Sequence, residues 1–250
     1  MNLLPIEIKV NIEGDVAAAL SALGGAGAAQ TMRRIWFAED RDGVAEGRVR
    51  LLDEGVIVRF RIGGGPDELT VKLRPCEREQ LVGRFAGPFD PPPFTYRIEE
   101  DWSADDRVVA ASLTHAHPAG ALLGAVQPGG DSAASIDAVQ DQFLDVCAPE
   151  VQLDGLVALG PVLSMKAADV ALGDLEVDLE AWRVAGLEFL EVSTRVKPKS
   201  EEDAGELTAR AERRQRKLEE AVREVGVTPS ELPESKTHRV LTALAEAGRP

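Results

Sequence analysis

The 250-residue sequence is poor in the features that mark secreted and membrane proteins. It holds 2 cysteines, Cys76 and Cys147, whose separation matches no close metal-binding or redox spacing, so a reducing compartment is favoured over a disulfide framework. No run approaches the roughly 20 apolar residues of a membrane span, and no basic-then-apolar leader opens the chain. We therefore expect a cytoplasmic protein without a membrane partner.

Basic residues are also in the minority. The chain has 28 Lys and Arg against 43 Asp and Glu, for a net charge of −15, which argues against a general nucleic-acid-binding surface. A local group of cations in a sheltered cleft can nevertheless bind a small polyanion. The 44% of apolar and 28% of charged residues are typical of globular proteins, and we expect a single domain over residues 1–250.

The first segment with a clear pattern is "LPIEIKVN" at residues 4–11. Apolar and polar residues alternate strictly there, as in a strand with one buried face. Ile6, Ile8 and Val10 share the apolar face, while Glu7 and Lys9 lie on the other.

A hairpin is predicted at residues 56–62 and 68–74, on either side of a Gly-Gly-Gly-Pro-Asp turn. Each of its strands has one apolar face. Arg59 and Arg61 occupy the opposite face of the first strand, and Lys72 occupies that of the second. The hairpin therefore carries its cations on one side.

Other strands are expected near residues 33–37 and 94–102, and as an antiparallel meander over 160–170, 174–184 and 187–196. Residues 107–126 fit a strand or a helix. Helices are predicted near 15–23, over 131–147 with Asp131 or Ser132 as the N-cap, and over 201–226 with Ser200 as the N-cap. A short helix over 235–248 closes the chain, and we expect residues 200–250 to pack on the sheet as helices.

About eight strands thus combine an apolar face with a charged face, and two architectures fit this pattern. In an open α+β sheet the charged face is solvated. In a closed antiparallel barrel with helices packed outside, the charges point into the lumen. The barrel would gather Lys9, Arg59, Arg61 and Lys72 around one cavity, where their repulsion calls for an anionic ligand. Further candidates for the same cavity are Arg74, Arg97 and Lys166.

The order of four motifs resembles the CYTH family, also called triphosphate tunnel metalloenzymes. The motifs are "IEIK", "VRFR" with "TVKLRP", "LEVDL" with "GLEFLEVS", and "ESKTHRVL". The resemblance runs from about residue 4 to residue 244 and is weakest over 103–160. It implies an eight-stranded antiparallel tunnel that binds a triphosphate with Mg²⁺ or Mn²⁺. Family members hydrolyse inorganic or thiamine triphosphate, or cyclise ATP.

The match to the family motifs is uneven. The family's opening motif, Glu-x-Glu-x-Lys, aligns with Pro5, Glu7 and Lys9 of this chain. The family's closing motif, Glu-x-Glu, aligns with Glu191 and Ser193, so one carboxylate is missing from each motif. The basic positions match well. The resemblance therefore implies phosphate binding by Lys9, Arg59, Arg61, Lys72 and Lys166, metal binding by Glu7, Asp178 and Glu191, and catalytic roles for Glu7 and Glu191. Glu99 is a further carboxylate for the metal.

The two missing carboxylates affect metal chemistry more than phosphate binding. Lys and Arg neutralise phosphate oxygens, whereas Mg²⁺ and Mn²⁺ require carboxylate oxygens. We therefore expect a protein that binds triphosphate, polyphosphate or a nucleoside or thiamine triphosphate, with a weakly bound metal and weak triphosphatase activity. A non-catalytic binding module and an adenylate cyclase are the alternatives.

His115 and His117 form a His-x-His pair. On a strand both rings would lie on one side, but the sequence shows no third ligand at a useful spacing. The pair is therefore interpreted as part of the packed structure.

Overall fold

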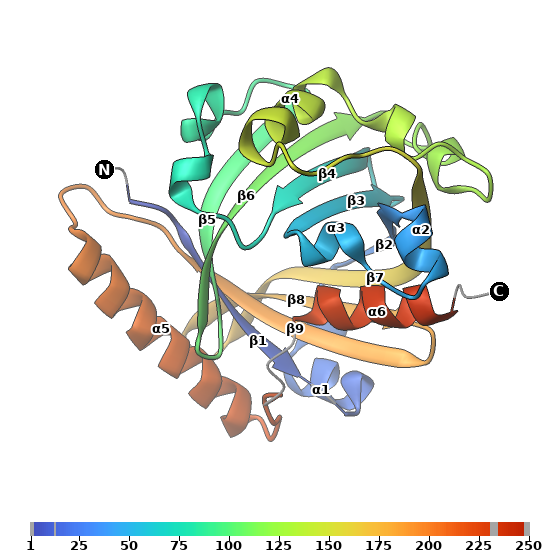
Figure 1. Cartoon of the computed structure of the whole chain (residues 1–250). Coiled ribbons are helices and arrows are strands. Elements are labelled where there is room, and N and C mark those ends of the chain that lie inside the picture. Colours follow the sequence, from blue (N-terminus) through green and yellow to red (C-terminus); the bar gives the residue numbers. More distant parts are fainter. Residues whose placement is uncertain (1–2, 13, 231–234, 248–250) are drawn as a thin grey trace. The chain divides into compact units, whose positions relative to one another are not determined.

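The structure, a computed structural model, describes residues 3–12, 14–230 and 235–247. Nine strands form a closed barrel in the order β1-β5-β6-β4-β3-β2-β7-β8-β9, with helices on the outside (Figure 1). The predicted α+β barrel is confirmed, with nine strands in place of eight. It is mixed, because β1 pairs with β5 in parallel.

The strands are β1 (Ile6–Ile12), β2 (Gln30–Asp40), β3 (Val56–Ile62), β4 (Asp67–Leu73), β5 (Phe94–Ser103), β6 (Asp106–His117), β7 (Leu156–Leu172), β8 (Leu175–Val184) and β9 (Leu187–Val196). The helices are α1 (Val16–Ala22), α2 (Arg41–Ala45), α3 (Arg50–Asp53), α4 (Ala138–Cys147), α5 (Ala204–Glu224) and α6 (Lys236–Ala247).

Strand β6 is the element that the sequence pattern left open. Ala110, Ala111 and Ala116 are compatible with a helix by propensity, but the segment pairs with β4 over seven residues, from Asp67 opposite His117 to Leu73 opposite Ala111. Tertiary pairing therefore decides its conformation.

The chain divides into two compact units. The first unit comprises residues 1–32, 99–108 and 164–234, and the second comprises 33–98, 109–163 and 235–250. Strands β2, β5, β6 and β7 contribute residues to both units. The expectation of a single domain stays a prediction.

The core of the first unit joins the apolar faces of its strands to α1 and α5. Ile6, Ile8 and Val10 are buried in it, which explains the alternation at the start of the chain. Helix α5 contributes the predicted apolar stripe of Leu207, Ala211, Leu218 and Val222. The apolar residues that recur with the 3.6-residue period of this helix are therefore the residues of its buried face.

The second unit has an aromatic core. The ring of Phe85 lies 5.6 Å from Tyr96 and 5.1 Å from Phe143 of α4. The Tyr96 hydroxyl donates a hydrogen bond of 2.8 Å to the Phe85 carbonyl, so its polar end is satisfied. Gln140 of α4 donates to the carbonyls of Leu69 and Leu113, which attaches this helix to β4 and β6.

Two predicted helix N-caps were wrong. Helix α5 is capped by Asp203, not Ser200, because Asp203 and Glu206 exchange two hydrogen bonds in a capping box. Helix α4 begins at Ala138 and is capped by Asp137. Its expected caps have other partners: Ser132 donates to the Ala125 carbonyl, and Asp131 accepts from the amide of Ala134.

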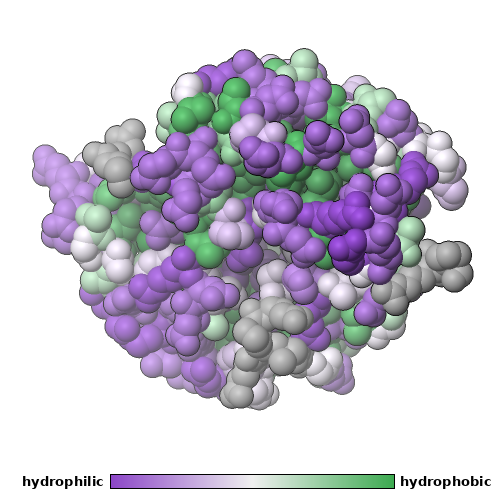
Figure 2. Space-filling view, in the orientation of Figure 1, coloured by the Kyte–Doolittle hydropathy of each residue, from purple (hydrophilic) through white to green (hydrophobic). Residues whose placement is uncertain are grey.

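Helix α6 confirms the closing helix and begins just after Ser235, whose hydroxyl accepts from the amide of His238. Glu234, the first residue of "ESKTHRVL", and Gly248, the predicted end of this helix, lie outside the described residues. Helix α5 presents a mostly hydrophilic surface, at lower left in Figure 2. Across the described ranges, no helix has the length and apolarity needed to cross a membrane.

A buried carboxylate holds the segment after β2. Glu39 is 1% exposed and accepts hydrogen bonds of 3.0 Å from the amides of both Leu51 and Leu52. Burial raises the pKa of Glu39 to about 7, although these backbone donors act in the opposite direction.

Replacing Leu218 should test the packing of α5. Leu218→Ala leaves a cavity at a fully buried position and should lower the free energy of unfolding by about 2–5 kcal/mol in urea denaturation. Arg216→Ala, at an exposed position of the same helix, should change it by no more than about 0.5 kcal/mol. Equal effects of the two changes would contradict this packing.

Glu39 should make stability depend on pH. A carboxyl with a raised pKa binds its proton more tightly in the folded state, so this group destabilises the fold as the pH rises from about 4.3 through 7. Glu39→Gln removes this titration. The melting temperature of the variant should therefore rise relative to that of the unchanged protein between pH 5 and pH 8; a constant difference would be the contrary result.

Candidate functional site

The polar face of β1 adjoins the polar faces of β5 and β9 in the first unit. Glu7 lies opposite Asp101 of β5 on one side and Arg195 of β9 on the other. Since directly paired residues share a face of a sheet, these side chains point the same way. The alternation that buries Ile6 and Ile8 therefore also gathers these charges.

Two cations on this face are each held by two carboxylates. The Lys9 ammonium lies 2.8 Å from Glu7 and 3.0 Å from Asp101, whose side chain is fully buried. The Arg195 guanidinium lies 3.2 Å from Glu7 and 3.1 Å from Glu99. Glu7 thus bridges the two cations.

The protonation states follow from these contacts. Burial acts to raise the pKa of Glu7, but Lys9 and Arg195 outweigh it and hold that pKa below its ordinary value. Burial likewise acts to lower the pKa of Lys9, whereas Glu7, Asp101 and Glu191 together raise it. Lys9 is therefore a cation and Glu7 an anion throughout the physiological range.

The same carboxylates form a candidate metal site. Glu7, Glu99 and Asp101 each place one ligand atom within 4.8 Å of the other two. Carboxylate oxygens are the ligands that Mg²⁺ and Mn²⁺ prefer, so the donor set fits the expected metal. The ammonium of Lys9 and the guanidinium of Arg195 neutralise these oxygens, and a metal must compete with both of them.

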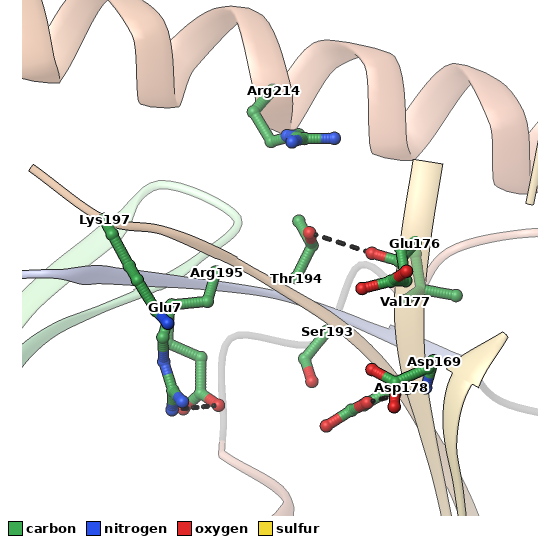
Figure 3. A pocket seen from close by; sticks show the side chains of 10 residues that line it. All are labelled: Glu7, Asp169, Glu176, Val177, Asp178, Ser193, Thr194, Arg195, Lys197 and Arg214. Atoms are coloured by element: carbon green, nitrogen blue, oxygen red, sulfur yellow. Dashed lines mark hydrogen bonds and ion pairs between the residues drawn. The ribbon is translucent and has the colours of Figure 1, made fainter. Parts of the chain in front are cut away.

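A pocket of about 320 Å³ opens beside this cluster in the first unit (Figure 3). Arg195 and Glu7 lie together at one side of it, Asp178 and Ser193 line another, and Arg214 approaches from α5. Its lining thus combines carboxylates and cations. Lys197, Asp169, Glu176, Val177 and Thr194 complete it.

The other predicted residues of the first unit lie on the adjoining strands. Asp178 of β8 lies opposite Ser193, and its carboxylate is 2.7 Å from the ammonium of Lys166 of β7. Glu191 lies opposite Asn11 of β1 and Glu180 of β8. Neither Asp178 nor Glu191 joins the group of closely spaced ligand atoms, and their role as metal ligands stays a prediction.

The cations of the hairpin share one face of the second unit. Arg59 lies opposite Thr70, Arg61 opposite Glu68, and Lys72 opposite Ile57, and the register places all six residues on the same side. Glu68 lies 3.8 Å from Arg61 and 2.8 Å from Arg33 of β2. Phosphate binding by Arg59, Arg61 and Lys72 stays a prediction.

Sequence reasoning missed Asp101 and Arg195. Both lie on the polar face of a predicted strand, so alternation alone would have selected them as candidates: Asp101 follows Glu99 by two residues, and Arg195 follows Ser193 by two. What the sequence did not show is the pairing of β5 with β1, which brings Asp101 to Lys9.

No protein-family model and no curated protein matches the sequence. Among solved structures, an adenylyl cyclase candidate from Hippeastrum with a dominant triphosphatase activity is similar at 14% identity and a TM-score of 0.58, over 99% of this chain and 97% of that one. An adenylate cyclase candidate from Bacillus halodurans is similar at 14% identity and a TM-score of 0.53, over 95% of this chain and 98% of that one. The chain therefore shares the fold of these two proteins, over nearly the whole length of each.

Replacing Lys9 should expose the charge of its partners. Lys9→Met leaves Glu7 and the buried Asp101 without this cation and should lower the free energy of unfolding at pH 7 by about 3–5 kcal/mol. Because the carboxyl pKa values then rise, the loss should shrink as the pH falls toward 4 and the acids take up protons. Chemical denaturation of the variant and of the unchanged protein, at pH 7 and at pH 4, measures this loss of unfolding free energy.

Lys217→Met is the matched control, since Lys217 pairs with Asp174 at the exposed surface of the same unit. Its effect should stay within about 1 kcal/mol at either pH. A loss for Lys9→Met that is as small as that of the control, or that does not vary with pH, would show that the Lys9 pairs do not support the fold.

Proposed function

We propose that the protein binds a triphosphate-containing anion through cations on the polar faces of its strands, with a divalent metal, and hydrolyses it weakly. The observation that carries this proposal is the double pairing of Lys9 and Arg195 with Glu7, Glu99 and Asp101. Cations and carboxylates that neutralise one another can also bind an anion and a metal together.

The chemistry of a triphosphate matches this arrangement. Its oxygens accept charge-assisted hydrogen bonds from ammonium and guanidinium groups, and an arginine can bind two of them at once. A phosphate that draws Lys9 and Arg195 away from their carboxylates would release Glu7, Glu99 and Asp101 to hold Mg²⁺ or Mn²⁺. Metal and phosphate binding are then coupled, with the metal bound weakly in the absence of the anion.

A metal held there would supply polarisation of the phosphoryl group and activation of a water. Glu7, whose pKa is low, stays charged as a ligand. Glu191 is the second proposed catalytic carboxylate, with Asp178 as a further ligand and Lys166 as a further phosphate contact. Pro5 and Ser193 replace two carboxylates of the family motifs, so we expect poor placement of the metal and slow turnover.

Hydrolysis is favoured over the cyclisation of ATP. The similar Hippeastrum protein is described as an adenylyl cyclase candidate in which triphosphatase activity dominates. Binding without turnover stays the main alternative, because Lys9 and Arg195 already neutralise the acidic group.

Removal of a single hairpin cation should weaken binding. Arg59→Met and Lys72→Met should each lower the affinity for inorganic triphosphate by about 1.5–3 kcal/mol in titration calorimetry, because each removes a charge-assisted contact. Arg183→Met is the control, since Arg183 is exposed and pairs with Glu188. If both hairpin variants bind as tightly as the control, these residues do not contact the anion.

Restoring a carboxylate should raise activity. Ser193 lies opposite Lys9 and Asp178 and lines the pocket with Glu7, so Ser193→Glu adds a charge on the metal side. Combined with Pro5→Glu, it should increase Mn²⁺-dependent release of phosphate, whereas Ser193→Gln, of equal size but neutral, should not. Turnover of the unchanged protein at about 1–10³ per second would instead show that its metal site is already sufficient.

A further inference from the structure

A second group of metal-binding side chains lies on the face of β4 and β6 that is opposite to Lys72. His117 pairs directly with Asp67, and His115 pairs with Leu69. Alternation therefore places both imidazoles on the side of the buried Leu69, while Thr70 and Lys72 lie on the other side. The residues that the proposed triphosphate site uses are absent from this face.

The structure brings two carboxylates to the histidines, which the sequence alone did not show. The imidazole rings of His115 and His117 are 4.0 Å apart between centroids. Asp137, the N-cap of α4, places Oδ2 3.9 Å from His115 Nδ1. Asp67 lies across the strand pair from His117 and is fully buried. The group thus contains two imidazoles and two carboxylates.

Three polar atoms of this group are buried without a hydrogen-bond partner in the described part of the chain: Asp67 Oδ1, His115 Nδ1 and His117 Nε2. Buried polar atoms are seldom left unpaired, because each loses its hydration without compensation. Three such atoms in one group are available to bind a ligand.

Both carboxylates are also held in the manner of metal ligands. Asp67 Oδ2 accepts from the amide of Leu122 at 3.1 Å, which leaves Oδ1 available. Asp137 Oδ1 accepts from the amide of Val139 at 2.8 Å, while Oδ2 faces His115. Ligating carboxylates are commonly oriented in this way by a hydrogen bond to their second oxygen.

We propose that His115, His117, Asp67 and Asp137 bind a divalent transition-metal ion of the Zn²⁺ class, at a site separate from the triphosphate site. Imidazole nitrogens select such ions over Mg²⁺ and Ca²⁺, and two imidazoles with two carboxylates supply the four ligands of tetrahedral zinc.

The group must contract to bind an ion. The described residues contain one set of three acidic or imidazole ligand atoms already within 4.8 Å of one another, and it is the Glu7 cluster. Rotation of the half-buried Asp137 side chain and of the two rings would close the second group around a metal. Asp67, fully buried and hydrogen-bonded, is the fixed ligand.

Titration calorimetry with Zn²⁺ alone, on the metal-free full chain, tests the proposal. We expect one Zn²⁺ per chain at this site, and a Co²⁺ adduct with the visible absorption of a tetrahedral ion. His115→Ala and His117→Ala should each weaken Zn²⁺ binding at least about tenfold, since even partners outside the first coordination sphere change metal affinity by 10–100-fold. His117→Gln serves if an alanine variant fails to fold, as judged by circular dichroism.

Two controls separate this site from others. His238→Ala removes the remaining histidine of the 3 in the chain, and Glu99→Gln weakens the acidic cluster of the first unit; neither should change Zn²⁺ affinity at the histidine site. A Zn²⁺ affinity that is unchanged in both His115→Ala and His117→Ala, or Zn²⁺ binding that is lost in Glu99→Gln, would overturn the proposal. So would the absence of Zn²⁺ binding to the unchanged protein.

Discussion

The pairing of Lys9 with Glu7 and Asp101 is the interaction around which the first unit is arranged. The desolvation free energy of this pairing is large, because Lys9, Glu7 and Asp101 lose contact with water when β1 pairs with β5 and β9. Each buried charge is tolerated only because its partners are near, and Arg195 extends the network to Glu99. A protein selected for stability alone could fill these positions with apolar residues, which supports a role in binding.

The distribution of charge suggests how binding proceeds. On the polar face of the first unit, carboxylates neutralise Lys9 and Arg195. On the hairpin face of the second unit, Glu68 of β4 lies opposite Arg61 and 3.8 Å from its guanidinium. An anion that takes Lys9 and Arg195 as partners leaves carboxylates that need a new cation. The proposed metal would meet that need, so anion and metal are expected to bind cooperatively.

The alternation of residues was enough to predict β1, the β3–β4 hairpin and the charged face of each, because side-chain period and burial are local properties. It did not determine β6, whose alanines suit either a helix or a strand, or the parallel pairing of β1 with β5. That pairing decides which carboxylates meet Lys9. The contact of Asp101 with Lys9 and the approach of Asp67 and Asp137 to the histidines were therefore visible only in the fold.

The coupling of metal and anion is tested most directly by the affinity for Mn²⁺, measured by electron paramagnetic resonance of the free ion. It should be measured with and without a non-hydrolysable triphosphate analogue. The charge exchange at Lys9 and Arg195 predicts weak Mn²⁺ binding alone and at least about tenfold tighter binding with the analogue, which corresponds to a coupling of about 1.4 kcal/mol. Mn²⁺ that binds equally well in both conditions would contradict the account.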